Sequence, residues 1–338
     1  MAVLITGGAG FIGSHTCVEL LNSGEDIVVI DNLYNSCTEA VERVKKITGR
    51  DLRFYRCDIC DREGLNAVFN ENDIESVIHF AGLKAVGESC SVPLKYYANN
   101  VGGTVELCSV MQEHGCKKIV FSSSATVYGQ NNPSPLNEDM PVGATTNPYG
   151  TTKYMIERIL SDLYSSDNSF AVCILRYFNP IGAHESGLIG EDPNGIPNNI
   201  MPRITQTALG KHDFVGIYGD DYDTRDGTGE RDYIHVVDLA KGHLAALNKV
   251  RRNNGLFTYN LGTGKGYTVY ELIKAYEKAS GTVIKTIISP RRPGDIAQCY
   301  SDPSKAQREL GWKAEKTLDD MCADAYRWQT MNPDGYLR

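Results

Sequence analysis

The sequence predicts an α/β fold in which helices cover both faces of a parallel sheet. Over the first half of the chain, short apolar segments alternate with amphipathic ones, which is typical of repeated strand–helix units. The first apolar run meets closely spaced glycines, which indicates a tight turn into a helix. With 338 residues, 41% of them hydrophobic and 22% charged, the chain suits one large domain or two interlocked domains.

The predicted elements follow in order along the chain. We expect strands at 3–6, 27–30, 52–55, 77–82, 118–121 and 170–176. We expect helices from 11 to 21 and at 38–47, 62–70, 94–113 and 149–164. Beyond residue 178 the alternation gives way to glycine- and proline-rich loops, shorter strands and scattered helices. This predicts a first domain at 1–178 and a smaller α/β substrate-binding region at 179–338, with segments such as 235–248 packing back on the first domain.

The turn after the first strand carries Gly7, Gly10 and Gly13. Glycines at these positions allow a close turn, and they let backbone N–H groups approach a pyrophosphate at the positive end of the helix. Asp31 ends the second strand about 20 residues later, where a carboxylate accepts hydrogen bonds from ribose hydroxyls and repels a 2′-phosphate. The pattern predicts a Rossmann-type fold that binds NAD rather than NADP. The alternative is a glycine-rich turn without a ligand.

Charge and cysteine content narrow the class of partner and the compartment. A net charge of -8 argues against nucleic acid as a partner, although local arginines can still bind a small anion. We find no apolar run long enough to span a membrane and no signal peptide, and we expect the ten cysteines to be reduced thiols in the cytosol. Cys57 and Cys60 have metal-ligand spacing, but no second pair accompanies them, so we expect no metal site.

A second group of polar residues suggests acid–base chemistry. Ser124 follows the strand at 118–121, and Tyr149 and Lys153 lie four residues apart at the start of a predicted helix. Residues at this spacing share one helical face, and a nearby ammonium lowers the pKa of a phenol. Tyr149 is then a general base, with Ser124 bonded to the same substrate oxygen. The alternative is an exposed Tyr/Lys pair on a helix surface.

Together these motifs resemble the extended short-chain dehydrogenase/reductase superfamily and, within it, the UDP-glucose (UDP-galactose) 4-epimerase family. The resemblance spans essentially the whole chain. It is carried by TGGAGFIG at 6–13, by Ser124 and by Tyr149-x-x-x-Lys153. The more specific segments are HFAGLKAVGES at 79–89, RYFNP at 176–180, PNNIMP at 197–202 and GERDYIHV at 229–236.

The resemblance implies a cofactor site and a substrate site. It gives Asp31 and Asn32 to the adenosine ribose, Asp58 and Ile59 to the adenine pocket, and Asn99 to a buried position near the nicotinamide. The cofactor set is Gly7, Gly10, Phe11, Ile12, Gly13, Asp31, Asn32, Asn35, Ser36, Asp58, Ile59, Phe80, Ala81, Gly82, Lys84, Asn99, Ser122, Tyr149, Lys153, Tyr177 and Phe178. The substrate set is Lys84, Ser124, Tyr149, Phe178, Asn179, Asn198, Asn199, Ile200, Tyr218, Arg231, Tyr233, Arg292, Asp295 and Cys299.

In the substrate set, the resemblance places Tyr218 against the uracil, Arg231 and Arg292 on the diphosphate, and Asp295 on the uridine ribose. Arginine forks suit diphosphate oxygens, and carboxylates suit ribose diols. Two alternatives stay open: Asn99 as a core amide that kinks a helix, and Arg231 as a surface ion pair with a neighbouring carboxylate.

The resemblance also implies a reaction without net redox change. Tyr149 takes the proton of the sugar 4-hydroxyl, hydride leaves carbon 4 for bound NAD, and the 4-keto sugar turns over and receives the hydride on its other face. Dehydratases and decarboxylases of this superfamily carry carboxyl groups after the catalytic serine, where this chain has Ala125 and Thr126. An epimerase is therefore favoured over these enzymes, over a net dehydrogenase and over a non-catalytic NAD-binding regulator.

Two finer expectations come from the same resemblance. The helices at 94–113 and 149–164 suggest a homodimer, because Val101, Val105, Cys108 and Met111 exceed the apolar residues that one sheet contact needs. The alternative is that all four face their own core. Cys299, set against the sugar's C2 substituent, leaves room for an N-acetyl group and so predicts activity on UDP-GlcNAc and UDP-GalNAc. Here the alternative is a small buried thiol.

Overall fold

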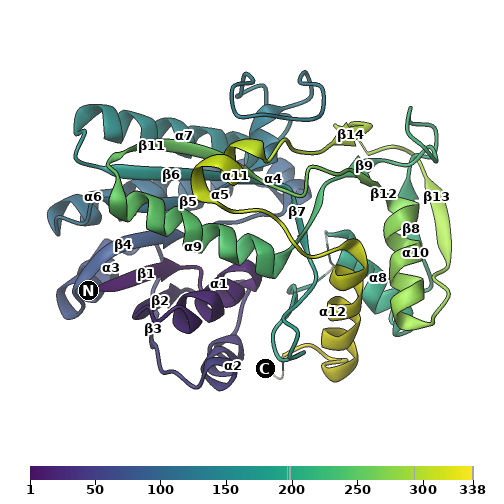
Figure 1. Ribbon diagram of the computed structural model, residues 1–338, viewed down its shortest axis with the longest axis horizontal. Helices are drawn as coiled ribbons and strands as arrows, with labels where there is room; N and C mark the ends of the chain where they lie inside the picture. Colours follow the sequence, from purple (N-terminus) through teal and green to yellow (C-terminus); the bar gives the residue numbers. More distant parts are fainter. Residues whose placement is uncertain (196, 198, 293, 337–338) are drawn as a thin grey trace.

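The computed structural model describes residues 1–195, 197, 199–292 and 294–336. Its main feature is a parallel sheet, as predicted; the sheet has seven strands in the order β11-β6-β5-β4-β1-β2-β3 (Figure 1). The strands are β1 (Ala2–Thr6), β2 (Ile27–Asp31), β3 (Arg53–Arg56), β4 (Ile74–His79), β5 (Lys118–Ser124), β6 (Ala171–Tyr177) and β11 (Gly255–Leu261). We call this sheet and its covering helices the first lobe.

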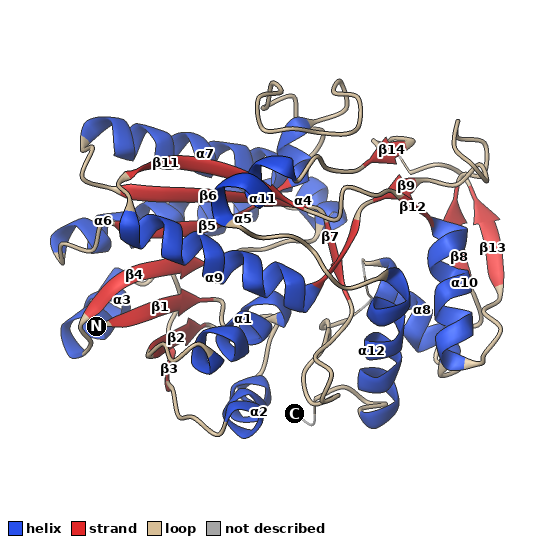
Figure 2. Ribbon diagram, in the orientation of Figure 1, coloured by secondary structure: helices blue, strands red, loops and turns tan. Residues whose placement is uncertain are grey.

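Successive strand residues point to opposite sides of the sheet, so each strand contributes side chains to a core on both faces. Val3 and Ile5 lie in one core cluster, whereas Leu4 lies in the other. The first cluster is covered by α1 (Phe11–Asn22), α2 (Thr38–Thr48) and α9 (Val236–Arg252). The second is covered by α3 (Arg62–Glu71), α6 (Gly103–Glu113) and α7 (Pro148–Ser166), and Figure 2 shows the two helical layers.

The remaining elements form a second lobe beside the sheet, on the right of Figure 1. Its core lies among α8 (Ile200–Ala208), α10 (Val269–Ser280) and α12 (Leu318–Met331). Three small sheets accompany these helices: β7 (Asn179–Ile181) with β10 (Tyr233–His235), β8 (Val215–Tyr218) with β13 (Thr286–Ser289), and β9 (Glu230–Arg231) between β12 (Tyr267–Thr268) and β14 (Gln298–Cys299).

Short helices complete the chain. They are α4 (Val86–Ser91), α5 (Pro93–Tyr96), η1 (Tyr97–Gly102), η2 (Ala125–Tyr128) and α11 (Ser304–Leu310). The structure departs from the predicted elements at two places, one helix and one strand. The helix expected at 94–113 is interrupted by η1, a π-helical segment with wider turns. The edge strand β11 comes from beyond residue 178, so the sheet draws on both halves of the chain. Within the described residues, no helix is long and apolar enough to cross a membrane.

Candidate active site

Ser124, Tyr149 and Lys153 meet where β5 ends and α7 begins, and all three are buried. The start of α7 is fixed by Pro148 in its first turn and by Asn147, whose side chain accepts a hydrogen bond from the Gly150 amide at 2.9 Å. Lys153 Nζ donates to the Ser122 carbonyl at 2.7 Å and lies 5.9 Å from the centre of the Tyr149 ring.

The pKa of the Tyr149 phenol differs from the expectation based on the sequence. Burial raises the pKa of Tyr149 to about 12, and a hydrogen bond from Ser124 opposes that rise. Burial also lowers the pKa of Lys153 to about 8, against the pull of the Glu157 carboxylate. The expected lowering of the phenol pKa is therefore wrong for the chain alone, because desolvation of the phenolate dominates.

The glycine loop forms a cradle that fits a pyrophosphate. Gly7 has a φ of +70°, and a Cβ there would stand 2.8 Å from the Ala81 nitrogen. A Cβ on Gly13 would stand 2.3 Å from the Gly7 carbonyl oxygen. At Gly10, the N-cap of α1, no side chain caps the helix, so the first-turn N–H groups of Phe11 and Ile12 are left to a ligand.

The acidic side chains beyond the loop are held in place by the chain itself. Asp31 accepts hydrogen bonds from the Ala9 amide at 3.1 Å and from Ser36 Oγ at 2.7 Å, while burial raises its pKa. Asp58 accepts from Asn32 Nδ2 at 2.7 Å. Burial alone would raise the pKa of Asp58, but this bond and others outweigh it and hold that pKa below its usual value. Asp31 is therefore bonded to Ser36, another predicted cofactor residue, and Asn32 on the expected ribose side is bonded to Asp58 of the expected adenine pocket.

Two neighbouring asparagines, Asn99 and Asn100, lie in the π-helical segment η1, where one asparagine was expected near the nicotinamide. Asn99 is half-buried, whereas Asn100 is buried and exchanges hydrogen bonds with the Leu83 backbone at 2.8 and 3.0 Å. In the chain alone Asn99 is therefore only partly buried within the π-helical turn, and its contact with the cofactor stays a prediction. Asn99 donates to Asn100 Oδ1 at 2.8 Å and so remains beside it.

The strands that lead into the nicotinamide side end beside one another. Phe80, Ala81 and Gly82 follow β4, and Tyr177 and Phe178 end or follow β6. Ser122 in β5 donates through Oγ to His243 Nε2 at 2.7 Å, because Nδ1 of that histidine donates to the Leu239 carbonyl. The side chain of Ser122 is thus used within the protein, and its carbonyl holds Lys153.

Strand pairing brings four predicted substrate residues together. Asn179 in β7 pairs with Tyr233 in β10, and Arg231 in β9 pairs with Cys299 in β14. Arg231 lies 3.7 Å from Asp295 rather than forming the ion pair with Glu230 or Asp232 that was left open. Tyr233 is buried in the core of the second lobe.

Other predicted substrate residues sit at exposed edges. The Arg292 guanidinium lies 3.7 Å from the centre of the Tyr218 ring. Asn199 precedes Ile200 in α8 and donates to Glu191 Oε1 at 2.7 Å. Glu191 also accepts from Lys84 at 3.2 Å and so joins the two lobes. Sequence reasoning missed Glu191, because it lies in an irregular loop without periodicity. Asn198 lies outside the described residues.

The two positions that separate the rival enzymes lie directly after Ser124. Ala125 and Thr126 form the start of η2, and the amide of Thr126 donates to Ser124 Oγ at 3.3 Å. Neither side chain carries a carboxyl group, so a further acid or base is not supplied from this turn.

Comparison with known proteins places this site in a family. Residues 4–325 match the family model described as GDP-mannose 4,6 dehydratase. The UDP-glucose 4-epimerase of Bacillus subtilis is 63% identical over 99% of both chains. The structure of the Bifidobacterium longum UDP-glucose 4-epimerase in complex with NAD+ and UDP has a TM-score of 0.97 at 57% identity, covering 99% of this chain and 100% of that one. The Stenotrophomonas maltophila enzyme with NAD and a formylated UDP-arabinopyranose has a TM-score of 0.96 at 49% identity, covering 98% and 99%.

Three observations point to the same family. They are the glycine cradle, the burial of Ser124, Tyr149 and Lys153, and this similarity over the full length. NAD is the cofactor that the fold is built to hold. The chain belongs to the UDP-glucose 4-epimerase family of NAD-dependent isomerases.

Proposed function

We propose that this protein interconverts UDP-glucose and UDP-galactose through a 4-keto sugar, with NAD retained between turnovers. The observation that carries the proposal is the meeting of Ser124, Tyr149 and Lys153 at the end of β5, at the same edge of the parallel sheet as the glycine loop and without a carboxyl group at 125–126. A dehydratase or a decarboxylase would need such a group, and a net dehydrogenase would release reduced cofactor.

Each chemical role is assigned to a side chain of this site. Tyr149 takes the proton of the sugar 4-hydroxyl and returns it, Ser124 hydrogen-bonds the same oxygen, and Lys153 provides positive charge that favours the phenolate. Bound NAD supplies the reversible two-electron chemistry at carbon 4. The buried position of all three side chains excludes water from the reacting group.

The second lobe binds the UDP portion. Arg231 and Arg292 neutralise the diphosphate, Asp295 accepts from the uridine ribose, and Tyr218 packs against uracil. Lys84, Asn179 and Asn199 contact the sugar nucleotide. In the chain alone several of these groups have partners within the protein, such as Glu191 and Asp295, that the substrate would replace or supplement.

We also propose activity on the N-acetylated pair, UDP-GlcNAc and UDP-GalNAc. Cys299 packs against a small cluster that contains Ala125 and Phe178, so its side chain lies on the same side of the site as the catalytic turn. A thiol at that place leaves volume that a larger side chain would fill.

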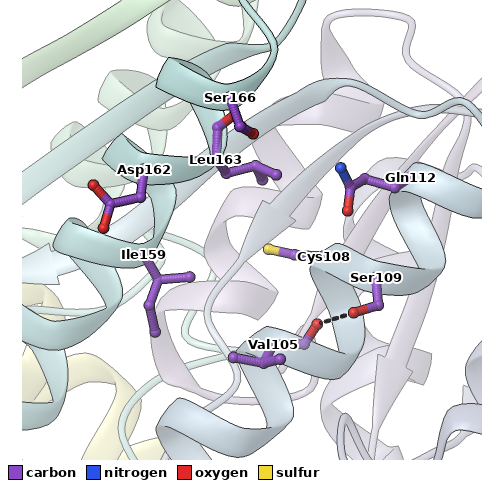
Figure 3. A pocket seen from close by; sticks show the side chains of 8 residues that line it. All are labelled: Val105, Cys108, Ser109, Gln112, Ile159, Asp162, Leu163 and Ser166. Carbon is purple, nitrogen blue, oxygen red and sulfur yellow. Dashed lines mark hydrogen bonds between the residues drawn. The ribbon is translucent and has the colours of Figure 1, made fainter.

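A homodimer through α6 and α7 is the assembly that we propose. Figure 3 shows a pocket of about 260 Å³ between these helices, lined by Val105, Cys108, Ser109, Gln112, Ile159, Asp162, Leu163 and Ser166. Val105 is 43% exposed, whereas Cys108 and Met111 are buried in their own core, as the alternative held for those two. Sedimentation at micromolar concentration tests the dimer, and a monomer would contradict it.

For location we propose the cytosol, where the ten free cysteines stay reduced, and cell fractionation tests it.

One experiment tests the proposed function directly. The purified protein is incubated with UDP-galactose without added NAD, and the product sugar is identified. We expect UDP-glucose and no accumulation of reduced cofactor. Formation of a dehydrated, decarboxylated or oxidised sugar would contradict the proposal in favour of the corresponding enzyme. An absence of any product from protein that contains NAD would favour a regulatory role.

A further inference from the structure

A buried ion pair lies behind the catalytic residues. Arg176 of β6 and Glu157 of α7 form a salt bridge at 2.7 Å, and their side chains are 7% and 6% exposed. Ser123 donates to the same carboxylate through its hydroxyl. Arg176 also donates to the Tyr128 hydroxyl at 3.2 Å, and that hydroxyl donates to Asn260 at 2.7 Å. These contacts tie β5, β6, α7 and η2 together.

The position of Glu157 connects both halves of the catalytic set. Glu157 lies one helical turn beyond Lys153 on α7, so the two side chains share a face. Its partner Ser123 stands between Ser122, whose carbonyl accepts from Lys153, and Ser124. A change at Glu157 therefore acts on the lysine through charge and on the two serines through the strand.

The other groups around Lys153 are neutral near pH 7. Burial lowers the pKa of His79 to about 3 and that of His243 to about 4. Burial raises the pKa values of Tyr149 and Tyr177. Lys153 also faces the Phe121 ring, at 4.8 Å from its centre. Among these groups the negative charge is on Glu157, and Arg176 is its partner on the side of β6.

We propose that Glu157 is a positioning residue for the epimerase reaction, which keeps Lys153 charged and, with Arg176 and Ser123, aligns the strand end that carries Ser124. The proposal rests on the roles given above to Tyr149 and Lys153. It assigns no contact with substrate to Glu157. A buried salt bridge of this kind adds little stability over a well-packed apolar pair.

The test is the pH profile of UDP-galactose turnover by the holoenzyme carrying Glu157→Gln. Removal of the negative charge lowers the affinity of Lys153 for its proton. The alkaline limb of the profile, along which Lys153 loses that proton, therefore moves to lower pH by about 1 unit, while the acid limb stays in place. Ser123→Ala keeps the charge and removes one alignment bond, so it lowers kcat without moving either limb. Where Glu157→Gln does not fold, Glu157→Asp moves the same limb by less.

The matched control is Glu75→Gln, which breaks the partly buried pair of Glu75 with Arg251 at the other end of the sheet. It leaves both limbs in place. Unmoved limbs in Glu157→Gln and in Glu157→Asp would overturn the proposal, as would an equal shift in Glu75→Gln. An inactive wild-type protein in the same assay would instead overturn the proposed function.

Discussion

The two lobes hold their functional groups in different ways. In the first lobe, Ser124, Tyr149 and Lys153 are buried at the ends of a strand and a helix, and the glycine loop is fixed by close backbone contacts. In the second lobe, Tyr218 is 40% exposed and Arg292 lies against its ring at the surface. The first lobe is therefore preorganised for chemistry, whereas the second supplies binding groups that a ligand can rearrange.

The largest expected effect follows from removal of the base in the first lobe. Tyr149→Phe deletes one hydroxyl and little volume, so turnover should fall by about 10²–10⁴-fold while NAD stays bound. Steady-state rates with UDP-galactose and the NAD content of the purified protein measure both. Tyr154→Phe, on the same helix and packed against Gly143, is the matched control and should keep its activity. A Tyr149→Phe protein with more than about a third of wild-type activity would exclude Tyr149 as the base.

The lobes should also respond unequally to acid. Burial lowers the pKa values of His15 and His79 to about 3 and that of His243 to about 4, and all three lie in the first lobe. Their unfolded value is 6.5, so the stabilisation is complete above pH 6.5 and is lost as pH falls toward the folded values. The loss is about 1.4 kcal/mol per pH unit for each histidine.

Urea unfolding at pH 7 and pH 5 measures this loss, and hydrogen exchange locates it. We expect the protection of amide groups, relative to their intrinsic exchange rates at each pH, to fall more in the sheet strands than in α10 and α12. The buried histidine of the second lobe, His235, has a carboxylate partner in Asp324 at 3.2 Å. A free energy of unfolding that is constant between pH 7 and pH 5 would contradict the prediction.

The contrast between the lobes also explains what the sequence could predict. The glycine loop, Asp31 and the Tyr149–Lys153 pair are predicted by local signals, because strand, turn and helix are read over adjacent residues. By contrast, β11 joins the sheet from beyond residue 178, which needs long-range pairing that periodicity does not report. The second-lobe residues could be assigned only by resemblance, since their short strands and loops have no regular pattern.

Two residues show the limit more sharply. Asn100 is buried beside a half-buried Asn99 in a π-helical turn, which lies within a helix whose apolar pattern looks continuous. Glu191 joins Lys84 to Asn199 across 107 and 8 residues of sequence, a link that depends on how the two lobes meet. Neither a local propensity nor a spacing rule contains this information.

A smaller effect is expected from an exposed residue of the second lobe. Arg292→Ala removes a cation from the proposed diphosphate site, so the Kd for UDP should rise by about 10–100-fold. NAD content and thermal stability should stay unchanged, because the side chain is exposed. Arg291→Ala is the matched control, because the guanidinium of Arg291 is bound to Asp221 and stacked on Tyr222. Equal effects of the two substitutions on UDP binding would contradict a specific role for Arg292.

The smallest effect on the main reaction is expected at Cys299. In Cys299→Tyr the ring should fill the space that an N-acetyl group needs, so turnover of UDP-GalNAc should be suppressed while UDP-galactose turnover is spared. Cys299→Ser keeps a small side chain and should retain both activities. Tyr300→Phe tests the neighbouring position, because Tyr300 directly follows β14 and its carbonyl accepts from the Leu136 amide at 2.8 Å. Product analysis with both substrates measures the ratio. Wild-type protein that converts UDP-galactose briskly and shows no turnover of UDP-GalNAc would contradict the assignment, because the space beside a cysteine would then not be what limits the choice of sugar.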